Sequence, residues 1–187
     1  HLVGYSMGGP IIGGFAEKYS DQVKSLSFIA PAGFGKVQTS FPFFMKIPGV
    51  IEWAMHVLAD RFYGSAISSE TTHSSDPLSI NEEEFQRLFS FQMQFKGFRE
   101  SLASTMRNFN LFDARDMFEK VAAKNIPSIA IWGDNDGIVS YKGAETYSEI
   151  FHEGKVITIQ DGTHDITYRQ PSDVLEAINI FLDSQIS

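Results

Sequence analysis

The chain has 187 residues, of which 43% are hydrophobic and 20% charged, so it is long enough and apolar enough to fold around one large core. Its formal net charge of −8 argues against nucleic acid or anionic lipid as a partner, because phosphate contacts need basic surface. With 0 cysteines, disulfides, thiolate metal sites and a cysteine nucleophile are excluded. No apolar run approaches the roughly 20 residues that span a bilayer, so we expect no transmembrane segment.

The first residues read as the end of a strand. Leu2 and Val3 precede a glycine, and no initiating methionine stands before them. We therefore expect the chain to be a fragment or a truncated product that begins inside a strand. A targeting signal cannot be read from such a start, so the cytoplasm is only the default location.

The two ends of the chain share one pattern. Short apolar runs predict buried strands at residues 23–30, 126–132 and 155–160. Apolar residues at helical spacing predict helices at residues 9–19, 141–151 and 171–183. Strands that alternate with helices of this length predict an α/β fold with a mostly parallel sheet and helices on its faces.

The middle of the chain differs from both ends. It has no comparable strand run, and its patterns predict helices at residues 51–60, 81–95 and 99–108, the second of them capped by Asn81. It also holds 13 of the 17 phenylalanines. We therefore expect an α/β core at residues 1–32 and 121–187, interrupted by an all-helical cap at residues 33–120.

Residues 4–8 read Gly-Tyr-Ser-Met-Gly and match the pattern G-x-S-x-G. In a sharp strand-to-helix turn, flanking glycines remove clashing side chains and the Ser6 hydroxyl stands out of the sheet edge. The Met7 N–H then lies at a helix N-terminus, where it can donate to an oxyanion. The alternative is a glycine-rich turn with an incidental serine. The strand before the motif and the apolar helix after it favour a nucleophile, with Tyr5 beside it as a candidate substrate contact.

A serine nucleophile needs a base and an acid that orients the base. Of five histidines, His164 stands in a loop just after a predicted strand, where parallel sheets place their chemistry. Asp136 follows another strand and is our choice for the acid. Asp134 is the second choice, because it directly follows a glycine and is better placed to bind the turn backbone. Serine, aspartate and histidine thus occur in the order known for α/β-hydrolases.

These stretches resemble the α/β-hydrolase fold family, with residues 1–9, 131–136 and 162–164 carrying the likeness. The resemblance implies Ser6 as nucleophile, Asp136 as acid, His164 as base, and a variable helical cap in the middle. The chain departs from many relatives at Thr163, where glycine is common, and at Ser140, where proline is common. In this family the second oxyanion donor comes from a segment upstream of the nucleophile strand, so the chain is expected to hold only the Met7 half of the oxyanion hole.

The sequence therefore predicts a serine hydrolase that cleaves small or apolar, lipid-like carboxylic esters through an acyl-serine, with no metal and no cofactor. The phenylalanine-rich cap favours an apolar substrate if those rings face the pocket. The alternative, favoured by the near-helical spacing of Phe85, Phe89 and Phe95, is that the rings pack the cap onto the core. One alternative is a carbon–carbon bond hydrolase acting on products of aromatic breakdown, with a substrate carboxylate bound by Arg99, Arg107 or Arg115. The other is a catalytically inactive remnant or binding module. The sequence leaves the oligomeric state open.

Overall fold

The computed structural model describes residues 1–35, 49–50, 53, 75–109 and 113–185. The chain divides into two compact units. The first, called the sheet unit below, comprises His1–Lys36, Asp76–Leu78 and Leu111–Ser187, and the second, the helical unit, comprises Val37–Ser75 and Ser79–Asn110. The sequence prediction drew its boundaries after residue 32 and before residue 121. The helix predicted at residues 51–60 lies, apart from Trp53, outside the described residues.

The sheet unit contains a four-stranded sheet in the order β1-β2-β3-β4, in which every neighbouring pair is parallel. Its strands are β1 (Leu2–Tyr5), β2 (Leu26–Ile29), β3 (Ser128–Gly133) and β4 (Lys155–Ile159). This arrangement confirms the predicted α/β class. Because all four strands run the same way, their carboxyl ends share one edge of the sheet, and the loops that follow them converge there.

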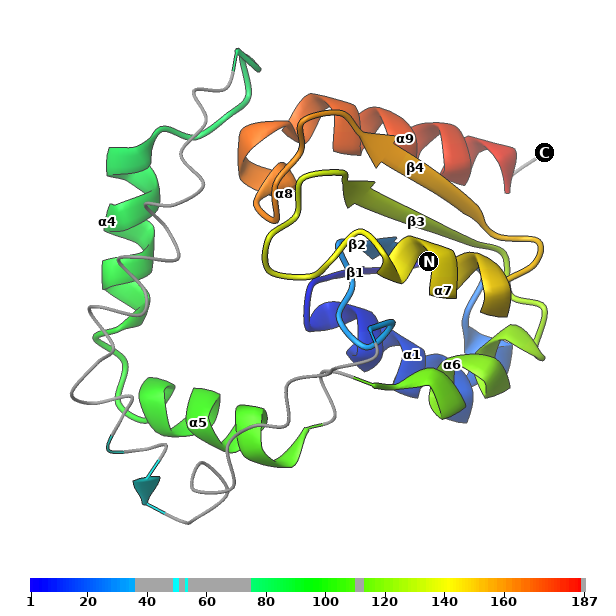
Figure 1. Cartoon of the computed structure of the whole chain (residues 1–187), viewed down its shortest axis with the longest axis horizontal. Helices are drawn as coiled ribbons and strands as arrows, with labels where there is room; N and C mark the ends of the chain where they lie inside the picture. The colour runs from blue at the N-terminus through cyan, green and yellow to red at the C-terminus, as the bar shows by residue number, and fades with distance from the viewer. Residues whose placement is uncertain (36–48, 51–52, 54–74, 110–112, 186–187) are drawn as a thin grey trace. The chain divides into compact units, whose positions relative to one another are not determined.

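Helices cover both faces of this sheet (Figure 1). They are α1 (Gly8–Lys18), the short 3₁₀ helix η1 (Ser20–Gln22), α6 (Arg115–Ala122), α7 (Gly143–Ile150), α8 (Ile166–Arg169) and α9 (Pro171–Ser184). The picture shows α1, α6 and α7 on one side of the strands and α9 on the other. Apolar periodicity in the sequence predicts α1, α7 and α9 but does not predict α6.

An aromatic cluster forms the centre of the core beneath α6 and α7. Phe28 of β2 is fully buried and meets Phe34, Phe118 and Tyr147 edge to face. Phe34 and Phe118 stack face to face, with ring centroids 3.9 Å apart. Fully burying such rings stabilises the fold by about 1.5–3 kcal/mol each. Two phenylalanines from the part of the sequence read as an insertion therefore belong to the core of the sheet unit.

A short segment from the middle of the chain also belongs to the sheet unit. The Asp76 carboxylate accepts hydrogen bonds from the backbone N–H and the hydroxyl of Ser172, at 2.8 and 2.9 Å. Ser172 lies in the first turn of α9, whose free N–H groups favour an anion. Asp76 thereby supplies the capping group that the start of α9 lacks in its own sequence.

The helical unit contains α4 (Glu82–Gln92) and α5 (Phe98–Asn108) among its described residues. Asn81 caps α4 by accepting a hydrogen bond from the Glu84 N–H at 2.8 Å, as predicted. Phe91 and Phe95 meet edge to face at 5.2 Å, and both rings are more than half exposed. No described helix combines the length and the apolar composition that a membrane crossing requires.

Candidate active site

Ser6 lies in a strained turn between β1 and α1. Its φ of +52° falls in the left-handed region, which residues with a side chain rarely adopt. Backbone bonds hold it there: the Ser6 N–H donates to Ile29 O at 2.8 Å, and the Ser6 carbonyl accepts from Ala32 N–H at 3.0 Å. A β-carbon at Gly4 would lie 2.4 Å from the Gly8 carbonyl oxygen, whereas one at Gly8 would meet nothing within 4 Å. Of the two flanking glycines, only Gly4 is required by contacts among the described residues.

The loops after β3 and β4 pack against each other backbone to backbone. A β-carbon at Gly133 would lie 2.2 Å from the Gly162 carbonyl oxygen, so no larger residue fits there. The Asn135 N–H donates to that same oxygen at 2.9 Å. This close approach places the loop that carries Asp136 beside the loop that carries His164.

The structure brings Ser6, His164 and Asp136 together. The His164 Nε2 lies 2.9 Å from the Ser6 Oγ, and the His164 Nδ1 lies 2.9 Å from the Asp136 Oδ2. The His164 side chain is 10% exposed and the Asp136 side chain 0%. Three residues that follow three different strands thus form one hydrogen-bonded chain at the carboxyl edge of the sheet.

The bonds of Asp136 determine the protonation pattern of this chain. Its Oδ1 accepts from the N–H groups of Ile138 and Val139 at 2.9 and 2.7 Å, so the carboxylate is held from behind while Oδ2 faces the imidazole. A carboxylate only accepts hydrogen bonds, so the proton of a neutral His164 resides on Nδ1. The lone pair of Nε2 then points at the Ser6 hydroxyl, which is the arrangement a general base needs.

The other predicted site residues lie around this chain. Met7 occupies the N-cap position of α1, directly after Ser6. The Tyr5 hydroxyl donates to the backbone carbonyl of His164 at 2.9 Å, and its ring stacks on the imidazole. Asp134, the second choice for the acid, does not contact His164, and its buried Oδ1 has no hydrogen-bond partner among the described residues. The turn-binding role expected of Asp134 is filled by Asp136.

Sequence reasoning missed a second carboxylate near the histidine. Asp165 accepts hydrogen bonds from the Thr163 hydroxyl and from the Arg169 Nε, and so ties the residues on both sides of His164 to α8. The spacing of Asp165 and Arg169, four residues apart in a short helical turn, is the signal that indicates this pair.

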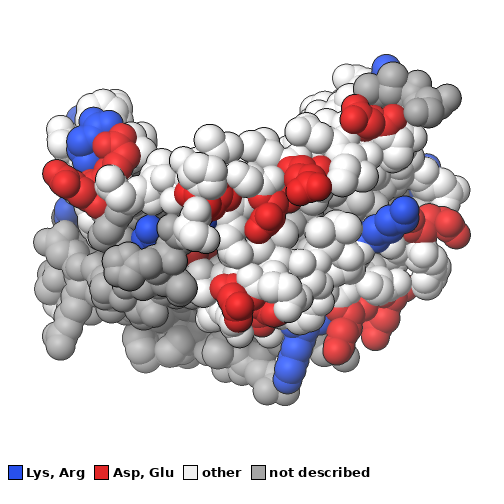
Figure 2. Space-filling model, turned by 90° about the horizontal axis from the view of Figure 1, so that it is seen from above, with Lys and Arg blue, Asp and Glu red and all other residues white. Residues whose placement is uncertain are grey.

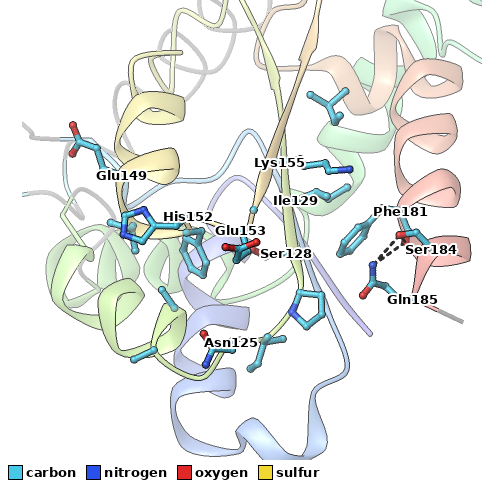
Figure 3. Close-up of a pocket in the computed structure, with 18 of the residues that line it drawn as sticks. Asn125, Ser128, Ile129, Glu149, His152, Glu153, Lys155, Phe181, Ser184 and Gln185 are labelled. Atoms are coloured by element: carbon cyan, nitrogen blue, oxygen red, sulfur yellow. Dashed lines mark hydrogen bonds between the residues drawn. The ribbon is translucent and has the colours of Figure 1, made fainter. Parts of the chain in front are cut away.

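A pocket of about 760 Å³ lies at the opposite edge of the sheet and shares no residue with the hydrogen-bonded chain. Figure 3 shows Ser128 and Lys155, the first residues of β3 and β4, between His152 in the turn after α7 and Phe181 on α9. Arg115 lines this pocket and pairs with Glu149 at 3.2 Å. Arg115, one of the three arginines considered for binding a substrate carboxylate, is therefore paired with Glu149 at the amino edge of the sheet. The side chain of Arg107, another of the three, lies outside the described residues.

Charged side chains are spread over the surface in Figure 2, with more acidic than basic groups on the face shown. Among the described residues, no group of three or more histidines, aspartates and glutamates is arranged to hold a metal ion.

The comparison with protein families gives the same class as the fold. The model of the alpha/beta hydrolase fold matches residues 1–170, and the chain belongs to this family. It is 27% identical over 181 residues to Lipase 3 of Moraxella sp. (strain TA144), and the alignment covers 88% of this chain and 50% of that protein. It is 23% identical over 193 residues to monoacylglycerol lipase ABHD6 of Mus musculus, which covers 98% of this chain and 55% of that protein.

Among solved structures, the bromoperoxidase from Bacillus anthracis superposes with a TM-score of 0.69 at 23% identity, covering 97% of this chain and 66% of that one. At this identity the likeness shows the fold alone. The chain spans about half the length of the curated relatives named here.

Proposed function

We propose that the protein hydrolyses carboxylic esters of apolar, lipid-like substrates through an acyl intermediate on Ser6. The observation that carries this proposal is the hydrogen-bonded chain from Ser6 through His164 to Asp136. A serine hydroxyl is a weak nucleophile at neutral pH, and this chain supplies both the base and the group that orients the base.

In the proposed acylation step, the Ser6 Oγ attacks the ester carbonyl carbon while the His164 Nε2 takes the hydroxyl proton. The carbonyl oxygen becomes an oxyanion and accepts a hydrogen bond from the Met7 N–H at the start of α1. His164 then passes the proton to the leaving alkoxide, so the alcohol departs and the acyl group stays on Ser6. The Asp136 carboxylate stabilises the imidazolium that forms in between.

In the proposed deacylation step, His164 takes a proton from a water molecule, whose oxygen attacks the acyl carbon. Collapse of the second tetrahedral intermediate breaks the bond to the Ser6 Oγ, which recovers its proton from His164. A carboxylic acid leaves and the starting state returns. No step needs an oxidant, a metal or an organic cofactor.

The relatives support the choice of substrate class. Lipase 3 and the monoacylglycerol lipase are named for action on lipid esters, and both align with most of this chain. We propose the same class of substrate here, and we propose that the helical unit, Val37–Ser75 and Ser79–Asn110, forms a cap that contributes to its selection.

The experiment that tests the proposal replaces the nucleophile in the full-length gene product. Ser6→Ala should abolish labelling by a fluorophosphonate probe and lower the hydrolysis of p-nitrophenyl butyrate by about 10⁴-fold or more. Ser140→Ala, in an exposed loop position, is the matched control and should keep both signals. Labelling that survives Ser6→Ala contradicts the assignment of Ser6. Faster turnover of a vinylogous diketone than of any ester favours carbon–carbon bond hydrolysis by the same residues.

A further inference from the structure

Tyr5 makes two separate contacts with His164. Its hydroxyl donates to the His164 backbone carbonyl at 2.9 Å, and its ring stacks on the imidazole with centroids 5.3 Å apart and planes inclined by 30°. Tyr168 of α8 also meets the Tyr5 ring edge to face, with ring centroids 6.1 Å apart. The tyrosine ring thus contacts both the histidine and a neighbouring helix.

These contacts join two parts of the site that are distant in sequence. Tyr5 is the last residue of β1 and directly precedes Ser6, whereas His164 lies 159 residues further on. The end of β1 is also linked to His164 by the hydrogen bond between the Ser6 Oγ and the His164 Nε2. That bond changes during the proposed reaction, because the acylated Ser6 Oγ has no proton to donate.

We infer that Tyr5 is a positioning residue that holds His164 in its reactive place while Ser6 carries the acyl group. In that state the backbone of His164 is held by the Tyr5 hydroxyl, and its ring by Asp136 and the Tyr5 face. The inference rests on the proposed function and deepens it. It also gives Tyr5 a different role from the substrate contact predicted from the sequence.

The Tyr5 hydroxyl keeps its proton under working conditions. Burial raises the pKa of this hydroxyl above its ordinary value, and the neighbouring Tyr168 and the carboxylates of Asp165 and Asp136 raise it further, while the Thr167 hydroxyl only partly opposes the rise. It therefore donates to the His164 carbonyl across the pH range in which an esterase is assayed. A change of pH within this range therefore does not break the hydrogen bond, and a substitution of Tyr5 is needed to remove it.

The kinetic test separates deacylation from acylation. Tyr5→Phe keeps the ring and removes the donor, so we expect kcat to fall about 3- to 10-fold while kcat/KM, which reports the steps through acylation, changes less than about 2-fold. KM then falls with kcat, and a burst of p-nitrophenol precedes the slower steady state. Tyr5→Leu removes the ring as well and should lower both kcat and kcat/KM.

Tyr141→Phe is the matched control. Its hydroxyl bonds to the Thr158 hydroxyl at 2.7 Å in a partly buried position without contacting His164, so its loss should leave the burst and kcat unchanged. Equal kcat in Tyr5→Phe and the unmodified protein overturns the inference. So does an equal fall of kcat and kcat/KM accompanied by a lower thermal midpoint, which is the mark of a purely structural role.

A spectroscopic test does not depend on turnover. In protein with ¹⁵N-labelled histidine, the Nδ1 proton that His164 shares with Asp136 should give a low-field resonance, assigned by its loss in His164→Gln. Tyr5→Leu should broaden or shift this resonance, and Tyr141→Phe should leave it in place. An unchanged resonance in Tyr5→Leu refutes positioning by Tyr5. If the resonance changes in Tyr5→Leu but the unmodified protein has no esterase activity, the positioning role of Tyr5 is supported and the proposed function is contradicted.

Discussion

The carboxyl edge and the amino edge of the sheet differ in the side chains and the cavity that they carry. At the carboxyl edge, Ser6, His164 and Asp136 follow three strands and form a continuous hydrogen-bonded chain. At the amino edge lies a pocket of about 760 Å³, lined in part by Arg115 and Glu149, whose side chains pair at 3.2 Å. The first edge has the hydrogen-bonded chain on which the proposed chemistry rests, and the second has a pocket that contains no residue of that chain.

Because the pocket and the hydrogen-bonded chain lie at different edges, the proposed site rests on the geometry of side chains and not on the size of a cavity. A reaction needs groups whose acid–base roles differ and whose geometry is held fixed, and the backbone contacts around Ser6 and Gly133 supply that rigidity. The carboxyl edge of a parallel sheet is where loops from several strands converge, so distant residues can be combined there. The comparison can be tested by perturbing each edge in turn.

Among substitutions of Asp136, Gly133 and Ile180, the largest effect is expected from Asp136, the proposed acid at the carboxyl edge. Asp136→Asn should lower kcat by about 10⁴-fold, because a neutral amide cannot stabilise the imidazolium and can donate to Nδ1, which selects the wrong tautomer. Asp134→Asn is the matched control, two residues away, and should change kcat less than about 3-fold. A larger loss in Asp134→Asn than in Asp136→Asn would exchange the roles of the two carboxylates.

An intermediate effect is expected from the close approach of the two loops. Gly133→Ala places a β-carbon where the Gly162 carbonyl stands, so the loops must separate and His164 must move away from Asp136. We expect kcat to fall about 10²-fold and the thermal midpoint to drop. Gly14→Ala, at an exposed helical position with open space around it, should instead stabilise the protein by about 0.5–1 kcal/mol. Equal activity in the two variants would show that the loops tolerate separation.

The smallest effect is expected at the amino edge. Ile180 of α9 lines the pocket and is 63% exposed. Ile180→Glu should leave kcat/KM for p-nitrophenyl butyrate within about 2-fold of the unmodified value, because surface substitutions away from a site change stability by under about 0.5 kcal/mol. A loss of kcat/KM on the scale of Gly133→Ala would mean that this pocket takes part in the reaction and that the contrast between the edges is wrong.

The fold could be predicted where the local pattern is strong. The apolar runs at residues 23–30 and 155–160 contain β2 and β4, and the run at 126–132 contains β3 except Gly133, because strands buried between helices need apolar residues on both faces. Helix α6 was missed although Phe118 and Val121 are buried at helical spacing, since its remaining positions are mostly polar and it lies beside a region read as an insertion.

From the sequence, the residues of the candidate site could be predicted only by their position directly after predicted strands. That rule selected Ser6, Asp136 and His164, and the structure brings these three together. It could not show that a side chain is excluded at Gly4 but not at Gly8, because the clash at Gly4 is with the Gly8 carbonyl, which only the folded turn brings close. It could not show that Tyr5 turns toward His164, because a contact between residues 159 positions apart leaves no local signal.

The sequence by itself determined the strands, most of the helices and the residue types at the strand ends, because apolar periodicity and turn chemistry act between near neighbours. Only the tertiary structure decided which carboxylate binds the histidine, which glycines must stay small, and what Tyr5 contacts. Those outcomes depend on distances of a few ångströms between loops of different strands, and such distances are set by how the whole sheet unit packs.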